Sequence, residues 1–238
     1  MRIPIVIVAV SCFSAAFVSF VNAQSESQPP VKIICIGDSI TQGGNVNEQE
    51  YTFRLPLYRL LRQKGINVDF IGTRSHGLNE NFHWPDDFDP DHEGFYGAST
   101  DEVRQQLSKD LPKLPAPDIA IIDLGSNDQG KEIGKAVIAP LTDIVSQLRA
   151  RNPDVKILII QIPGVFKNFS MHFLVWRMAL ELSQPRSPLI TIPLYIGWDT
   201  YGDTFEGAHP NIRGQDKIAA ALISEMEPLL KSISTQTK

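Results

Sequence analysis

Cysteine is scarce in this chain, and no stretch carries a long run of charge of one sign. Two cysteines among 238 residues allow at most one disulfide, which excludes a disulfide-stabilised scaffold. The 22 basic and 27 acidic residues give a formal net charge of −5, spread along the sequence. A mildly acidic chain without a basic cluster is not expected to bind nucleic acid or anionic lipid. The chain must therefore depend on a hydrophobic core.

Long hydrophobic runs are also absent, except at the N-terminus. Arg2 precedes an apolar run that ends in Val21-Asn22-Ala23, the pattern of a cleavable signal peptide over residues 1–23. The alternative is a membrane anchor, because the run approaches the length of a membrane-spanning helix. Three serines within it lower its hydrophobicity and favour cleavage. We therefore expect a secreted or periplasmic protein with no stable membrane insertion after cleavage.

Cleavage limits the chemistry of the remaining chain. Cys12 leaves with the signal peptide, so only Cys35 remains and no intramolecular disulfide can form. Cys35 lies in the apolar run VKIICIG, which favours a buried, unreactive thiol. Loss of the single charge of Arg2 changes the formal net charge from −5 to −6. The polar residues 24–30 read as a short tether, and residues 31–238 suffice for one domain.

Short apolar runs alternate with longer amphipathic stretches through this domain. The runs are rich in Ile and Val and lack polar alternation, which is typical of strands covered on both faces. They cover residues 33–36, 68–71, 119–124, 157–162 and 189–192. Helices are predicted over about 53–63, 100–111, 133–151 and 171–182, and a last one carries apolar residues at 218, 222, 226, 229 and 233. The alternation predicts a three-layer α/β/α sandwich of flavodoxin-like type around a five-stranded parallel sheet.

Three polar motifs follow the predicted strands or open the last helix. Gly37-Asp38-Ser39 follows the first strand, Gly125-Ser126-Asn127-Asp128 follows the third, and residues 206–211 precede the last helix. Ligands of such sheets bind beyond the carboxyl ends of the strands. We therefore expect the three motifs to meet at one edge of the sheet.

Ser39 is the candidate nucleophile and His209 its candidate base. A serine attacks only when a base takes its proton and hydrogen-bond donors await the oxyanion. Ser39 in isolation could also be a turn or helix-cap residue, and His209 a solvated surface histidine. His209 is distinguished by the Pro-Asn that follows it at the start of a helix. The other histidines are His76, His83 and His92, in a long loop, and His172, in a predicted helix.

Three groups are candidate donors to the oxyanion. They are the side-chain amide of Asn127 and the backbone N–H groups of Gly97 and Ser39. The competing interpretations are that Asn127 is only a turn residue and that Asp128 is only a helix N-cap.

The ordered set of motifs resembles the SGNH hydrolase, or GDSL esterase, superfamily. The matching blocks are Gly-Asp-Ser-Ile-Thr at 37–41, Gly97, Gly-Ser-Asn-Asp at 125–128 and His-Pro-Asn at 209–211. Residues 68–73 and 91–97 also look like the carbohydrate esterase family 3 acetylxylan esterases. Those enzymes act on acetyl groups of plant polysaccharide without a cofactor. The resemblance implies that Ser39, Gly97, Asn127 and His209 take the four family roles.

Two positions depart from the family pattern. Ser126 replaces the usual threonine, which keeps a small hydroxyl. Glu206 stands three residues before His209, where the family has aspartate. We place Glu206 first as the group that orients His209, Asp203 second, and a Ser-His dyad third.

The acidic loop 86–93 raises the question of a metal. If Asp87, Asp89 and Asp91 were the first ligands of an EF-hand loop, His92 would stand where glycine is needed and Ala98 where glutamate is needed. The EF-hand interpretation fails. We expect a solvated acidic loop and no metal, with a different kind of metal site as the alternative.

Aromatic residues near the motifs could bind sugar. Trp84, with Phe82 and Phe88, and Trp198, with Tyr195 and Tyr201, are candidate platforms for a sugar ring. Core packing is the alternative role for both groups.

Taken together, the residues predict a secreted serine esterase of short-chain carboxylic esters. O-acetyl groups on polysaccharide are the expected substrate, and no cofactor is expected. One alternative is a lipolytic or thioester-cleaving enzyme resembling a lysophospholipase. Another is a carbohydrate-binding protein in which the change at Glu206 has impaired catalysis.

Overall fold

A computed structural model of the protein describes residues 29–45, 51–161 and 169–236. The predicted signal peptide and residues 24–28 of the tether lie outside these ranges. Within them, no helix has both the length and the hydrophobicity needed to cross a membrane.

A parallel sheet forms the centre of the domain. Five strands run in the order β2-β1-β4-β5-β6. They are β1 (Val31–Gly37), β2 (Val68–Ile71), β4 (Ile119–Asp123), β5 (Lys156–Gln161) and β6 (Leu189–Pro193). The predicted five-stranded parallel sheet is confirmed, with one addition. The two-residue strand β3 (Glu93–Gly94) pairs with the end of β1.

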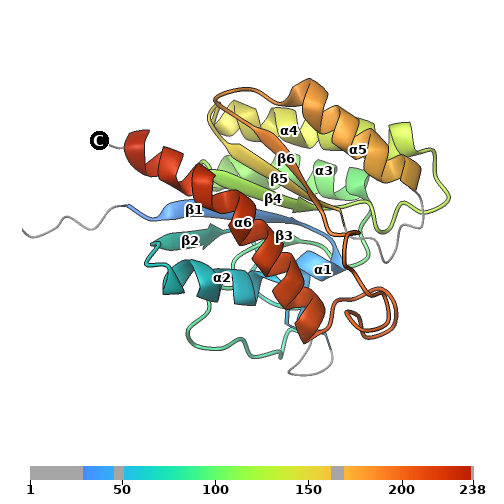
Figure 1. Cartoon of the computed structure of the whole chain (residues 1–238), viewed down its shortest axis with the longest axis horizontal. Helices are drawn as coiled ribbons and strands as arrows, with labels where there is room; N and C mark the ends of the chain where they lie inside the picture. The colour runs from blue at the N-terminus through green and yellow to red at the C-terminus, as the bar shows by residue number, and fades with distance from the viewer. Residues whose placement is uncertain (1–28, 46–50, 162–168, 237–238) are drawn as a thin grey trace, which may run out of the picture.

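Helices cover both faces of the sheet, as predicted. Figure 1 shows α2 and α6 on one face and α3, α4 and α5 on the other. The helices are α1 (Ser39–Gln42), α2 (Arg54–Gln63), α3 (Thr100–Asp110), the short 3-10 helix η1 (Leu111–Lys113), α4 (Ala139–Arg151), α5 (Phe169–Leu182) and α6 (Ile212–Gln236). The helix predicted over 133–151 differs at its start, where Gly134–Ile138 forms a π-helical turn, η2, before α4.

Alternate residues of β1 pack on opposite faces of the sheet, which explains why residues 33–36 are all apolar. Ile33 and Cys35 pack in the layer of α2 and α6, while Ile34 and Ile36 pack in the layer of α3 to α5. All four are at most 1% exposed. Cys35 is a free thiol, and burial raises its pKa to about 12. It is therefore held in the unreactive thiol form.

The polar motifs lie at the carboxyl ends of the strands. β1 leads into α1, β3 into residues 95–98, and β4 into residues 124–128, at the end of the sheet that also carries the loop before α6 (Figure 1). This is the edge at which open parallel sheets bind ligands.

Candidate active site

Ser39 and His209 are in contact although 170 positions separate them in the chain. His209 Nε2 lies 3.0 Å from Ser39 Oγ. Ser39 is the first residue of α1, and Asp38 caps this helix by accepting the N–H of Ile40 at 3.1 Å. Ser39 is 9% exposed. The hydroxyl therefore sits in a sheltered position within hydrogen-bond reach of an imidazole.

Glu206 contacts the opposite side of the same imidazole. Its Oε1 contacts His209 Nδ1 and also accepts the backbone N–H of His209 at 3.2 Å. The backbone N–H of Phe205 donates to the carbonyl of His209, which closes a tight loop, and Gly207 has a positive φ of 87° within it. This turn brings a glutamate three residues upstream against the ring. Carboxylate, imidazole and hydroxyl thus form one continuous series.

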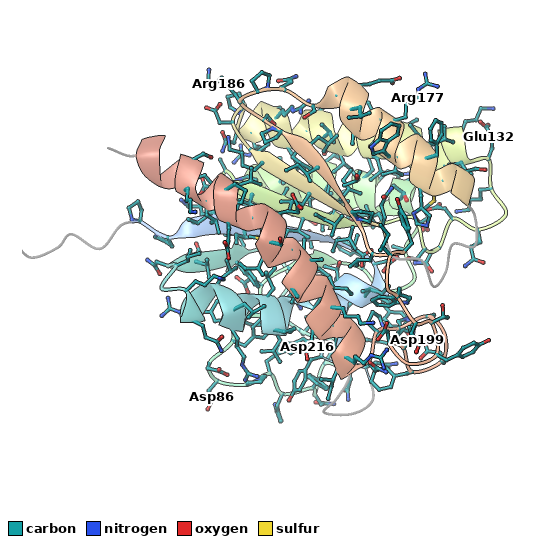
Figure 2. All side chains as sticks on the ribbon, in the orientation of Figure 1. Asp86, Glu132, Arg177, Arg186, Asp199 and Asp216 are labelled. Atoms are coloured by element: carbon teal, nitrogen blue, oxygen red, sulfur yellow. The ribbon has the colours of Figure 1, made fainter. Side chains whose placement is uncertain are left out.

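Asp203, the second candidate to orient His209, is engaged elsewhere. Its buried carboxylate lies 2.6 Å from both Arg213 Nε and Lys217 Nζ, and it accepts the backbone N–H of Asp199. Burial acts to raise its pKa, but the hydrogen bond from Lys217 and these charges hold the pKa below its usual value. Asp203 therefore braces the loop before α6, on which Figure 2 labels Asp199.

Asn127 lies in the turn after β4, and its amide is held from two sides. Nδ2 lies 3.0 Å from the Ala98 carbonyl and 3.2 Å from Asp38 Oδ2. The neighbouring Asp128 accepts both the N–H and the hydroxyl of Thr100, at 2.9 and 2.7 Å. Asp128 therefore ties the turn to the start of α3 and does not cap a helix that follows it.

Gly97 belongs to a loop that is bonded to the nucleophile's turn. Its φ of 75° lies in the left-handed region that favours glycine. In the same loop, Phe95 donates its N–H to the carbonyl of Gly37 at 2.9 Å, and Tyr96 donates its N–H to Gln42 Oε1 at 2.8 Å. The structure thus brings Ser39, Gly97, Asn127, Glu206 and His209 to one edge of the sheet.

A small cavity of about 30 Å³ opens beside Ser39 and His209. Its aromatic lining comes from Tyr51, Phe53, Tyr96 and Phe205. No periodic pattern in the sequence distinguishes these four residues from the other aromatic residues. Their only common feature in the sequence is proximity to the motifs or to the loop after α1.

The two tryptophans proposed to bind sugar do not line this cavity. The ring of Trp84 packs against those of Tyr51, Phe82 and Phe88, and its N–H donates to the carbonyl of Ser75 at 2.9 Å. Trp198 is partly buried against the core layer of α2 and α6. Both tryptophans make packing contacts, and their binding of sugar stays a prediction.

Two buried carboxyl groups lie close to the nucleophile, one directly after β1 and the other at the end of β4. Asp38 is fully buried and Asp123, at the end of β4, is 2% exposed. Gly37, next to Asp38, is the register partner of Asp123. Burial raises the pKa of Asp38 to about 6, and burial together with the charge of Asp38 raises the pKa of Asp123 well above its usual range. The pair therefore retains protons at a pH where surface aspartates are ionised.

Among the described histidines, only His209 contacts Ser39. His92 is fully buried, with its Nδ1 2.8 Å from the N–H of Gly94 and its Nε2 3.0 Å from the carbonyl of His76. Burial lowers the pKa of His92 to about 2, so the ring is neutral and fixes the strand β3.

The acidic loop is occupied by structural contacts. Asp87 forms an ion pair with Arg59 at 3.0 Å, and Asp89 accepts the N–H of Phe70 at 2.8 Å. Figure 2 shows Asp86 below α2, well away from the loop that carries Asp199. Across the described ranges, no three His, Cys, Asp or Glu side chains are grouped so that they could hold a metal ion.

A serine hydroxyl, an imidazole and a carboxylate in series at the carboxyl edge of a parallel sheet are the features of a carboxylic ester hydrolase. The chain belongs to the GDSL-like lipase/acylhydrolase family, whose model matches residues 35–175. The resemblance drawn from the motifs is thereby confirmed.

Relatives of known structure share this fold. A carbohydrate esterase family 3 protein from Talaromyces cellulolyticus has a TM-score of 0.71 and 24% identity, covering 85% of this chain and 99% of its own. A family 3 carbohydrate esterase from Clostridium thermocellum has a TM-score of 0.71 and 23% identity, covering 86% and 99%.

A curated relative is longer than this chain. A multidomain esterase from Ruminococcus flavefaciens is 24% identical over an alignment 235 residues long, which covers 87% of this chain. The chain spans 30% of the length of that relative.

Proposed function

We propose that the protein is an exported serine esterase that removes short acyl groups, above all O-acetyl groups, from polysaccharide. The observation that carries the proposal is the small cavity beside Ser39. Its volume of about 30 Å³ is of the order of one or two water molecules. The methyl group of an acetyl ester needs no more space than this.

In this proposal, His209 accepts the proton of Ser39 as Oγ attacks the carbonyl carbon of the ester. The carbon–oxygen bond to the alcohol then breaks, and His209 returns the proton to the departing alcohol oxygen. Water, deprotonated by His209, releases the acid and restores Ser39. Glu206 orients the imidazole and stabilises its charged form.

The oxyanion of each tetrahedral intermediate is held by three donors in this mechanism. They are the backbone N–H groups of Ser39 and Gly97 and the side-chain amide of Asn127. Hydrogen bonds to Asp38 and Ala98 hold the Asn127 amide in the turn after β4, and one of them is shared or released when the oxyanion binds. Loss of one such donor typically costs about 10²–10³ in turnover.

The alcohol side of the proposed substrate is argued from the rim of the cavity. Tyr96 and Phe205 line the cavity and are 39% and 40% exposed. Aromatic faces of this kind present an apolar surface on which a sugar ring can lie. The carbohydrate esterases of T. cellulolyticus and C. thermocellum support the same class of substrate.

The test is acetate release from acetylated xylan by the wild type and by Ser39→Ala. We expect release by the wild type only, with hydrolysis of a chromogenic acetyl ester that exceeds hydrolysis of the decanoyl ester. Preference for the decanoyl ester would contradict the short-acyl proposal and favour a lipolytic enzyme. Equal rates for wild type and Ser39→Ala would remove Ser39 from the mechanism.

Export is tested separately. Expression of the full chain in a bacterial host is expected to give a product that begins at Gln24 in the periplasm or medium, as read by mass spectrometry. A membrane-bound product that retains Met1 would contradict the proposal.

A further inference from the structure

The ring of Tyr96 lies nearly parallel to the imidazole of His209. The ring centroids are 5.7 Å apart and the planes meet at 18°. Tyr96 also lines the cavity that holds Ser39 and His209. The contact is therefore made on a face of the imidazole, whereas Glu206 and Ser39 contact its edge.

The backbone of Tyr96 is fixed to the turn that carries the nucleophile. Its N–H donates to Gln42 Oε1 at 2.8 Å, and Gln42 is the last residue of α1 and 2% exposed. The preceding residue, Phe95, donates to the carbonyl of Gly37. Phe95 and Tyr96 are thus bonded to the two ends of the segment 37–42, which contains Ser39. The ring of Tyr96 and the nucleophile are therefore held by the same backbone segment.

His209 needs such a support because its own surroundings are open. Its side chain is 37% exposed, and that of Glu206 is 54% exposed. Hydrogen bonds at Nδ1 and Nε2 fix two points of the ring and leave it able to tilt about the line that joins them. A parallel aromatic ring restricts that tilt.

Charge favours the same arrangement. Glu206 contacts His209, and the buried Asp38 lies close enough for the charge of His209 to act against the rise of the Asp38 pKa. An aromatic face within about 6 Å also attracts a cation, which the imidazole becomes when it takes the proton of Ser39.

We propose that Tyr96 is a positioning residue of the esterase reaction, whose ring keeps the imidazole of His209 aligned between Glu206 and Ser39. The inference rests on the proposed function. A misalignment of about 1 Å in such a group can cost on the order of 10²-fold in rate. The contact with His209 is made by the ring, so the proposal predicts that phenylalanine can replace tyrosine.

The test compares Tyr96→Leu, Tyr96→Phe and Tyr51→Leu on a chromogenic acetate ester. Tyr51 is the matched control, because it lines the same cavity while its ring packs on Phe82 and Trp84. We expect Tyr96→Leu to lower kcat by about 10- to 100-fold with little change in KM. Tyr96→Phe should retain at least half of kcat, and Tyr51→Leu should act mainly on KM.

A second measurement is the rate at which an organophosphonate inactivates each variant, because this reaction also needs the activated serine. It should fall in Tyr96→Leu in parallel with kcat. Thermal unfolding of each variant is recorded, and Tyr96→Ala serves as a second truncation if the leucine variant does not fold.

The outcomes separate the two proposals. A wild type that is no more active than Ser39→Ala contradicts the proposed function itself. An active wild type whose kcat is unchanged in Tyr96→Leu overturns the positioning role alone. Equal losses in Tyr96→Phe and Tyr96→Leu also overturn it, because the stacked ring would then not be what matters.

Discussion

The side-chain amide of Asn127 donates to the carboxylate of Asp38, with 3.2 Å between Nδ2 and Oδ2. The same nitrogen lies 3.0 Å from the Ala98 carbonyl. An asparagine amide has two N–H groups, so both have acceptors in this state. To bind an oxyanion, Asn127 must share or release one of them. Asp38 therefore holds the side-chain amide of Asn127 in addition to capping α1.

Asp38→Asn is expected to lower kcat about 10- to 100-fold with little effect on KM, because an amide in place of the carboxylate cannot accept from both Ile40 and Asn127. Steady-state kinetics on an acetate ester check this. The control is the double variant with Asn127→Ala. If Asp38 acts through Asn127, the double variant is no slower than Asn127→Ala, whereas losses that simply multiply contradict the coupling.

The pH dependence of stability should also change in Asp38→Asn. Burial raises the pKa of Asp38 in the folded protein to about 6, above the 3.8 of an exposed aspartate, so the folded protein retains a proton between these values that the unfolded chain releases. This contribution to stability is complete below about pH 4 and is lost as pH rises through about 6. The free energy of unfolding of the wild type should thus fall, relative to the variant, by about 3 kcal/mol at most across this window. Urea denaturation at several pH values measures the difference, and a constant gap would contradict the prediction.

Glu206 and Asp203 should differ in what their loss affects. Glu206→Gln leaves the imidazole without its carboxylate, and we expect kcat to fall by about 10²–10⁴ with thermal stability unchanged. Asp203→Asn removes the buried negative charge that pairs with Arg213 and Lys217, which we expect to cost about 3 kcal/mol of unfolding free energy. Its kcat per folded molecule should stay within a few-fold of the wild type. The reverse pattern would assign the orienting role to Asp203.

Two glycines near the nucleophile offer a matched pair of substitutions. A Cβ at Gly94 would lie 2.6 Å from the backbone nitrogen of Gln42, whereas a Cβ at Gly97 has no neighbour within 4 Å. Gly97→Ala therefore suffers only from its positive φ, about 1 kcal/mol. Gly94→Ala must push β3 away from α1, at about 3 kcal/mol. Chemical denaturation distinguishes the two, and equal losses would contradict the steric argument.

The sequence was most informative where burial is complete. The central strands β4 and β5 begin and end within one residue of the predicted runs, because every residue in them is buried and a strand covered on both faces has an apolar interior. β3 was missed, since two residues, one of them glycine, have no periodicity. The π-helical turn at Gly134–Ile138 was missed because its composition does not differ from that of a helix.

The same contrast holds for the site. The meeting of Ser39 with His209 followed from the rule that the carboxyl ends of parallel strands share an edge. The choice between Glu206 and Asp203 did not follow from any such rule. It depends on the turn closed by the hydrogen bond of Phe205 and on the ion pair between Lys217 and Asp203. The stack of Tyr96 on His209 joins two loops whose relative position no local pattern encodes.

Arg54 anchors the turn that carries Ser39 through hydrogen bonds to backbone carbonyl groups. Its buried guanidinium donates to the carbonyl oxygens of Thr41, Gln42, Pro90 and Asp91. Burial lowers its pKa only to about 10. A clamp made from a permanent cation and backbone dipoles contains nothing that titrates in acid. The attachment of residues 41–42 to residues 90–91 should therefore survive acidification, even though Asp38, which caps the same helix, has a pKa of about 6 and takes up a proton there.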